Sequence, residues 1–99
     1  MPGILLDLNN PAFQETWFAL DRSEALAVLA TLRKIRQLDW SRLYADRGLR
    51  WEAILSKTGP AGRRIYSLRI TRSMRAVAYR EGAFLRFLSL HADHDSAYR

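Results

Sequence analysis

The feature of this sequence that most restricts its fold is a change of hydrophobic period along the chain. Residues 65–70 alternate, so that Tyr66, Leu68 and Ile70 fall on one face of a β-strand and polar residues on the other. Before residue 39, apolar residues instead recur at the spacing of an amphipathic α-helix. Helical segments followed by strand segments are typical of a domain whose helices and strands are segregated. The sequence therefore predicts an α+β fold.

Two helices are predicted in the N-terminal half, after a short first strand at residues 4–8. Asn10 and Pro11 form a helix-start signal, because asparagine is a good N-cap and proline fits the first helical position. Asp21, with Glu24 three residues later, marks a second helix that should end near residue 38. The two helices are close in sequence and should form a helical hairpin. The predicted buried stripe of the second helix contains Ala25, Val28, Leu29, Leu32 and Ile35.

Strands are predicted in the rest of the chain. Residues 51–55 should form one strand, and residues 58–62 a loop because they are rich in glycine and proline. Segments 65–70, 75–79 and 84–90 should follow as an antiparallel meander joined by short turns. The expected fold class is α+β, in which an N-terminal helical hairpin packs on a small, mainly antiparallel β-sheet. All 99 residues should belong to this one domain.

The charge of the chain is unevenly distributed. Its net charge is +6, and residues 60–99 hold eight arginines, no lysine and only three acidic residues. Arginine binds phosphate with two parallel hydrogen bonds and stacks on nucleic-acid bases. The arginine-rich half therefore favours a polyanion partner such as nucleic acid. A solvated basic surface, or a patch that docks an acidic protein, is the alternative.

Several classes of protein are not expected from the composition. The sequence has no cysteine, so neither a disulfide framework nor a thiolate metal site can form. No apolar stretch approaches the roughly 20 residues that a membrane-spanning helix needs. The first residues lack the basic and apolar regions of a signal peptide. We expect a cytoplasmic protein with no membrane partner, no metal and no cofactor.

Two arginines of the predicted meander are candidates for a phosphate site. Arg69 and Arg75 flank a turn centred on Arg72, so their side chains should lie opposite each other on one sheet face. Like charges directly opposite are destabilising by some tenths of a kcal/mol, and a phosphate between them would relieve the repulsion. Alternatively, the side chains splay apart or one of them pairs with Glu52 or Glu81. A slip of one residue in the register would separate the pair.

The histidines and Glu52 are candidates for acid–base chemistry. Both histidines lie in residues 91–99, and histidine has the unperturbed pKa nearest to neutral pH. Either His94 or His91 could act as an acid or base. Metal binding by His91, Asp93 and His94, or a polar tail without function, are the alternatives. Glu52 is either a structural ion-pair partner of an arginine or a general base.

Residues 66–79 (YSLRITRSMRAVAY) resemble the central hairpin of RelE/ParE-superfamily toxins, where an arginine-bearing strand and a turn precede an Arg-aliphatic-Val-x-Tyr strand. Residues 48–52 (GLRWE) resemble the segment before the sheet of that family. Residues 91–98 (HADHDSAY) resemble its ending, in which a basic residue or histidine precedes a terminal tyrosine. With the helical hairpin, the resemblance covers nearly the whole chain. YoeB-like members differ in a shorter loop at positions 56–64 and in having the terminal histidine and tyrosine adjacent.

The resemblance implies a type II toxin that a cognate antitoxin neutralises and that cleaves mRNA in the ribosomal A site without a metal. In this reading Arg75 holds the scissile phosphate and Arg69 supports it. Glu52 is the general base, and His94 is the acid that protonates the leaving oxygen, with His91 as its alternative. The terminal tyrosine orients or stacks on the substrate. Tyr98 is the terminal tyrosine of this sequence. Arg72, Arg64 and Lys57 are expected to contact the RNA.

Two other functions are compatible with the same fold. A ParE-like protein would inhibit DNA gyrase and would not cleave RNA. A non-catalytic descendant would act only as an interaction module. Because members of this superfamily share one fold and differ in activity, the fold cannot decide among these functions.

Overall fold

Both predicted helix starts carry a side chain that caps the helix. In this computed structural model, which describes residues 3–92, α1 (Pro11–Ala19) begins after Asn10, whose side chain accepts a hydrogen bond from the first helical turn at 2.9 Å. Likewise α2 (Arg22–Arg36) begins after Asp21, whose carboxylate accepts a hydrogen bond from the first turn at 2.8 Å. These bonds satisfy backbone N–H groups that have no partner within the helix. The local sequence therefore fixes where each helix begins.

A third helix, α3 (Trp40–Ala45), was not predicted. The Asp39 carboxylate caps it by accepting a hydrogen bond from the first turn at 2.8 Å. Arg80 reaches the helix from the sheet, with its guanidinium carbon 4.2 Å from the centre of the Trp40 ring and an N–H donated to the Tyr44 hydroxyl at 3.0 Å. A helix of six residues is too short for a helical period to be read from its sequence. Contacts with the sheet hold α3 in place.

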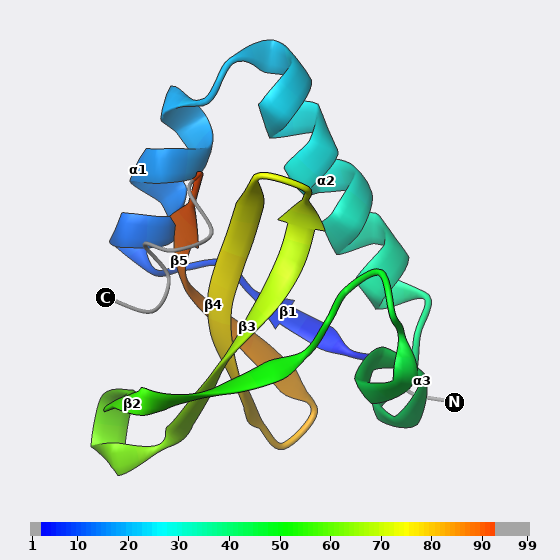
Figure 1. Cartoon of the computed structure of the whole chain (residues 1–99), viewed down its shortest axis with the longest axis vertical. Helices are drawn as coiled ribbons and strands as arrows, with labels where there is room; N and C mark the ends of the chain where they lie inside the picture. Colours follow the sequence, from blue (N-terminus) through cyan, green and yellow to red (C-terminus); the bar gives the residue numbers. More distant parts are fainter. Residues whose placement is uncertain (1–2, 93–99) are drawn as a thin grey trace.

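Five strands form one mixed sheet (Figure 1). In the order β1-β5-β4-β3-β2 across the sheet, β1 pairs with β5 in parallel and all other neighbours are antiparallel. The 3₁₀ turn η1 (Pro60–Gly62) joins β2 to β3. The α+β class, the helical hairpin and the mainly antiparallel sheet are thus confirmed. The strands are β1 (Leu5–Asp7), β2 (Glu52–Thr58), β3 (Arg64–Thr71), β4 (Met74–Glu81) and β5 (Phe84–His91).

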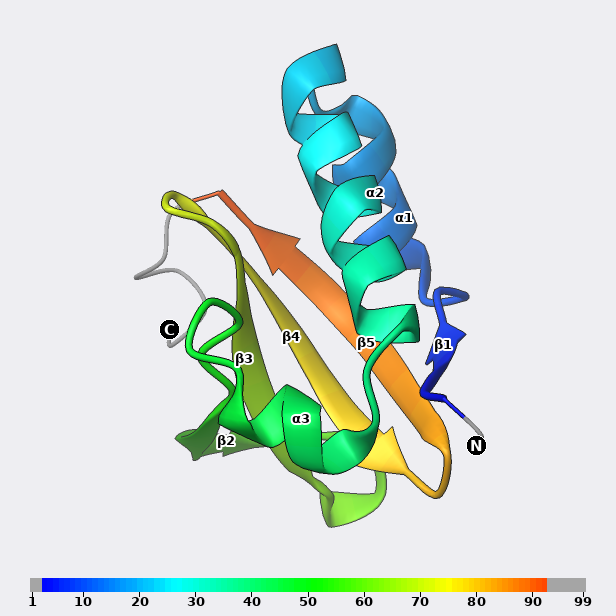
Figure 2. The same cartoon turned by 90° about the vertical axis from the view of Figure 1, so that its right-hand side faces the viewer.

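The main core lies between the two long helices and one face of the sheet (Figure 2). Phe13 of α1 packs on Phe87 of β5, with 5.2 Å between the ring centres. The alternation in β3 turns the apolar set containing Leu68 toward this core, as the sequence predicted. No helix within the described part of the chain is both long enough and apolar enough to cross a membrane. Other buried members of this core are Ile4, Val28, Leu32, Ile35, Leu43, Leu49, Met74, Ala76, Ala78, Leu85 and Leu90.

One member of the predicted helical stripe was assigned wrongly. Val28, Leu32 and Ile35 are buried, but Leu29 is 40% exposed. At 100° per residue, Leu29 points about 90° away from the centre of the stripe that the three buried residues define. The sheet contacts only a narrow strip of α2, so a residue at that angle remains in solvent.

The short strand β1 is held against β5 by charged hydrogen bonds. Arg86 of β5 donates to the Asp7 carboxylate at 2.6 Å and to the Glu81 carboxylate at 2.7 Å. A hydrogen bond from the backbone N–H of Asn9, followed by that from Arg86, holds the pKa of the Asp7 carboxyl below its ordinary value. The Arg86–Asp7 bond supports the only parallel pairing of the described sheet, between residues far apart in the sequence, while Glu81 lies on the neighbouring strand β4.

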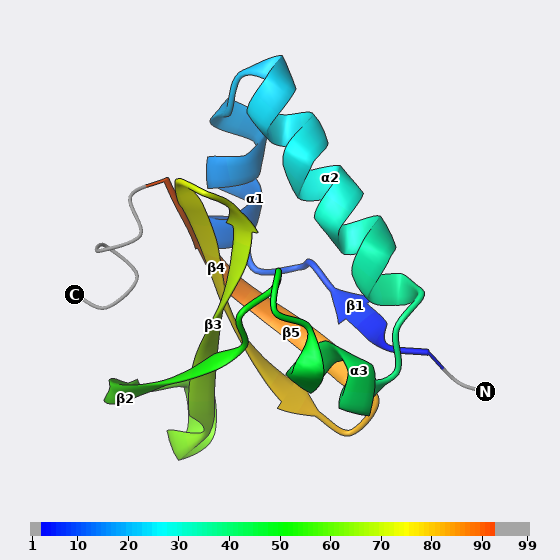
Figure 3. The same ribbon diagram turned by 45° about the vertical axis from the view of Figure 1, so that its right-hand side comes forward.

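The second face of the sheet has its own smaller apolar cluster. Ile54, Ile65 and Val77 are buried there, and Tyr79 and Leu88 pack against them. Figure 3 shows α1 and α2 on one side of the sheet and the β2–β3 hairpin extending away from them. We call the side that carries Ile65 and Val77 the helix-free face. It holds the candidate site.

Candidate functional site

The two arginines of the β3–β4 hairpin lie directly opposite each other, as predicted. Arg69 and Arg75 are cross-strand partners, so their side chains project from the same side of the sheet. Leu68 and Ala76, which alternate with them, belong to the main core. Arg69 and Arg75 therefore project from the helix-free face. On the other side of β4, the residue opposite Arg75 is His91 of β5, which faces the same way.

Arg75 is an unusually buried charged residue with few close contacts. It is 5% exposed, and one guanidinium nitrogen donates to the Ser67 hydroxyl at 3.4 Å. Another nitrogen lies 3.9 Å from Oε1 of Glu52. Charge-assisted hydrogen bonds of arginine are usually about 2.7–2.9 Å long, and the group has five N–H donors. Within residues 3–92, Arg75 therefore keeps donor capacity that a phosphate could use.

Glu52 lies at the start of β2, opposite Ser67 and therefore on the helix-free face. Its Oε1 is 3.6 Å from Nε of Arg50 and 3.9 Å from Nη2 of Arg75, while the side chain is 46% exposed. The structural ion pair considered from the sequence is thus present, although both distances are long. Both arginines make their given contact with Oε1, and the side chain is half-exposed. The carboxylate is therefore open to a ligand on this face.

His91, at the end of β5, completes the described cluster. Its Nε2 lies 2.8 Å from the Ser89 hydroxyl, and burial lowers the pKa of the imidazole below 6.5. The positive charge of Lys57 lowers this pKa further. The other predicted acid, His94, and the predicted terminal Tyr98 lie outside the described residues, as does Asp93. A titratable side chain with a shifted pKa, near arginines and a carboxylate, is typical of functional sites.

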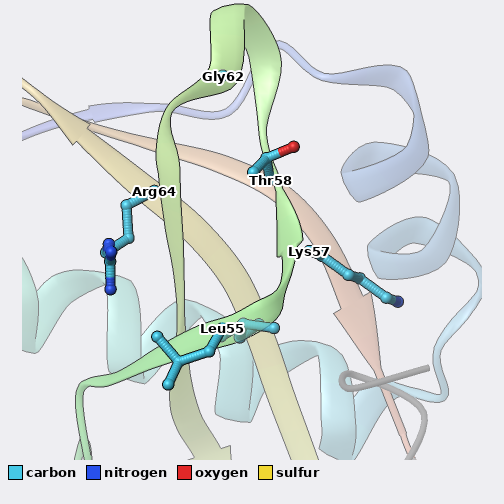
Figure 4. Close-up of a pocket in the computed structure, with 6 residues that line it drawn as sticks. Leu55, Lys57, Thr58, Gly62 and Arg64 are labelled. Carbon is cyan, nitrogen blue, oxygen red and sulfur yellow. The ribbon is translucent and has the colours of Figure 1, made fainter.

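The other predicted RNA contacts are less concentrated. Lys57 is close enough to act on His91, and Arg72 is exposed at the tip of the β3–β4 hairpin. Arg64 alternates with Ile65 and so projects from the opposite face of β3. Figure 4 shows Arg64 and Lys57 extending from opposite sides of the β2–β3 hairpin, around a cavity of about 120 Å³. The structure thus does not bring Arg64 to the Arg69–Arg75 cluster.

One residue of the site, Arg50, was missed in the sequence. Its backbone is left-handed, with φ 49°, a conformation that costs a non-glycine residue roughly 1–2 kcal/mol. Its guanidinium contacts Glu52, which lies two residues later. No residue pattern identifies such a contact, because it depends on the turn that precedes β2. A strained residue beside a charged cluster is a reason to look for function there.

A metal centre is not evident in the described part of the chain. Between residues 3 and 92, no group of three or more histidine and acidic side chains is arranged to hold a metal ion. The metal set considered from the sequence, His91 with Asp93 and His94, includes two residues outside this range. The described cluster consists instead of cations, one carboxylate and one imidazole.

Comparison with known proteins shows the fold. No protein-family model matches the sequence, and no curated protein matches it significantly. One similar solved structure is that of a copper-bound mutant toxin from Helicobacter pylori. It has a TM-score of 0.52 and 22% sequence identity, and the alignment covers 97% of this chain and 98% of that chain. The chain therefore has the α+β fold of that structure.

The lowered pKa of His91 predicts how stability depends on pH. Because the folded pKa lies below the unfolded value of about 6.5, the unfolded state binds a proton first on acidification. The free energy of unfolding should therefore fall as the pH drops from 6.5 and should level off below the folded pKa. In His91→Gln this loss should be absent. Urea denaturation of both proteins between pH 7.5 and 5 measures the difference, and parallel curves would contradict the expectation.

Proposed function

We propose that this protein is the toxin of a type II toxin–antitoxin system, related to RelE and YoeB, and that it cleaves mRNA on the ribosome. The observation that carries the proposal is the pairing of Arg69 with Arg75 on the helix-free face, beside Glu52 and His91. The toxin-like fold and the resemblance of the β3–β4 hairpin to RelE/ParE toxins support the same function. The net charge of +6 is consistent with an RNA partner.

The proposed reaction needs no metal, because the RNA supplies its own nucleophile. A ribose 2′-OH attacks the adjacent phosphorus atom while Oε2 of Glu52 accepts the hydroxyl proton. The Arg75 guanidinium, supported by Arg69, stabilises the negative charge that develops on the phosphoryl oxygens. The bond from phosphorus to the 5′-oxygen breaks, and an acid gives that oxygen a proton. The products are a 2′,3′-cyclic phosphate and a 5′-hydroxyl end.

The remaining roles follow from the chemistry of each side chain. His94 is the proposed acid, and His91 is the alternative that lies beside Arg75 in the described structure. Tyr98 would stack on or orient the substrate. Lys57 and Arg72 would bind phosphates that flank the cleavage site, and Arg64 would contact RNA from the other side of its hairpin.

The proposed partners are the mRNA, the ribosome and a cognate antitoxin that blocks the helix-free face or its surroundings. The working location would be the cytoplasm, where these partners meet. Phosphate contacts dominate such association, so binding to ribosomes should weaken strongly with added salt.

The direct test is a purified translation system followed by primer extension on the message. The protein should halt translation and produce cuts within codons in the A site. A message with a single 2′-deoxyribose at the nucleotide before the cut should resist cleavage at that position, because it lacks the nucleophile. The matched all-ribose message is the control, and cleavage of both messages would exclude this mechanism.

Further measurements on DNA and on cell growth separate the two other candidate functions. Intact mRNA together with gyrase-dependent DNA breaks would identify a gyrase inhibitor. Intact mRNA with intact DNA and unimpaired growth after strong expression would identify a non-catalytic interaction module.

A further inference from the structure

We infer that Arg50 is a positioning residue that holds the Glu52 carboxylate so that Oε2 faces the substrate; the inference rests on the proposed function. Nε of Arg50 and Nη2 of Arg75 both approach the same atom, Oε1 of Glu52, at 3.6 and 3.9 Å. Two cations that approach the same oxygen favour one rotation of the carboxylate. That rotation leaves Oε2 as the oxygen that would accept the proton of the substrate.

The backbone of Arg50 shows that its position is imposed by the surrounding turn. The residue has φ 49°, in the left-handed region that favours glycine. The turn is fixed at its start by Asp46, whose carboxylate accepts a hydrogen bond from the backbone N–H of Leu49 at 2.9 Å. Lys34 of α2 holds the same carboxylate at 3.0 Å. The backbone N–H of Arg50 then donates to the Asp46 carbonyl at 3.2 Å.

The turn is also fastened to the strand that carries the phosphate site. The Leu49 carbonyl accepts a hydrogen bond of 2.6 Å from the backbone N–H of Arg69. Arg50 therefore follows a residue that is bonded directly to β3, and its guanidinium reaches Glu52 from a fixed base. The turn sets the position of Arg50 relative to Arg69. Arg50 in turn positions the carboxylate of Glu52.

The side chain and the backbone of Arg50 can be tested separately. In Arg50→Gly the guanidinium is lost, but glycine adopts the left-handed backbone without strain, so the protein should fold at least as stably as the wild type. In steady-state cleavage on ribosomes, kcat should fall roughly tenfold to a hundredfold while KM changes little. The reason is that a misdirected base slows only the chemical step. Arg50→Lys should restore part of the rate.

A double-mutant cycle decides whether Arg50 acts through Glu52. If it does, Arg50→Gly should cause no further loss in a Glu52→Gln background, because the group that it positions is already disabled. If Arg50 binds RNA directly, the two losses should multiply and KM should rise. That second result would overturn the inference and leave the proposed function intact.

A neighbouring arginine provides the matched control. Arg47→Gln removes the same charge from the same turn, and Arg47 has no contact with the described cluster. It should cleave at the wild-type rate. Equal losses in the Arg47 and Arg50 variants would mean a general charge effect and overturn the inference. Absence of cleavage by the wild-type protein would instead overturn the proposed function.

Discussion

Replacing Arg75 with alanine is expected to reduce the proposed mRNA cleavage by about a hundredfold to a thousandfold, the range seen when one group that stabilises transition-state charge is removed. Arg75 is buried beside Ser67 and Glu52 and opposite Arg69, so no other described cation occupies the same place. Arg75→Lys keeps the charge but loses the planar fork, and it should recover only a small part of the rate. Primer extension at saturating ribosome concentration measures both variants.

The control for Arg75 must separate a lost catalytic group from lost charge or a lost fold. Arg33→Ala removes one positive charge from the exposed surface of α2, and it should cleave normally. Circular dichroism and thermal melting should show that the Arg75 variants remain folded. If folded Arg75→Ala cleaves mRNA at the wild-type rate, the proposed site is wrong. That result would not by itself decide whether the protein is a toxin.

Replacing Phe87 with alanine is expected to destabilise the protein by about 3–5 kcal/mol, as for other buried phenylalanines. Phe87 is 1% exposed and packs on Phe13, so its truncation leaves a cavity between α1 and the sheet. Domains of this size have a stability of roughly 5–15 kcal/mol, so much of it would be lost. Urea denaturation with a free fit of the m-value measures the change.

Phe18→Ala is the matched control for this core substitution. Phe18 is 72% exposed, and the same truncation there should change stability by no more than about 0.5 kcal/mol. Similar losses in both variants would show that the Phe13–Phe87 contact does not anchor α1 on the sheet. Because β5 also carries His91, the Phe87 variant should lose cleavage activity and stability together when it is warmed.

Much of the fold was predictable because the information is local. Asn10 and Asp21 cap their helices through atoms only two or three residues away. The alternation in β3 and the turn after it set the register that places Arg69 opposite Arg75. In each case the spacing along the chain already determines which groups meet. The facing pair of Arg69 and Arg75 could therefore be proposed from the sequence.

The rest depends on contacts between distant segments. The parallel pairing of β1 with β5, the helix α3 and the exposure of Leu29 arise only once helices and sheet are packed together. The approach of His91 to Arg75 needs the order of strands in the sheet. Sequence patterns report period and caps, but they do not report which strands become neighbours.

The sequence by itself determined the class of the fold, the starts of α1 and α2 and the facing arginines of one hairpin, because these follow from neighbours along the chain. Only the tertiary structure showed that Arg50 contacts Glu52. It also showed that Arg64 projects away from the face that carries Arg69 and Arg75. The physical reason is that a side chain's partners depend on backbone turns and on the face of the sheet. These are settled when the whole domain packs.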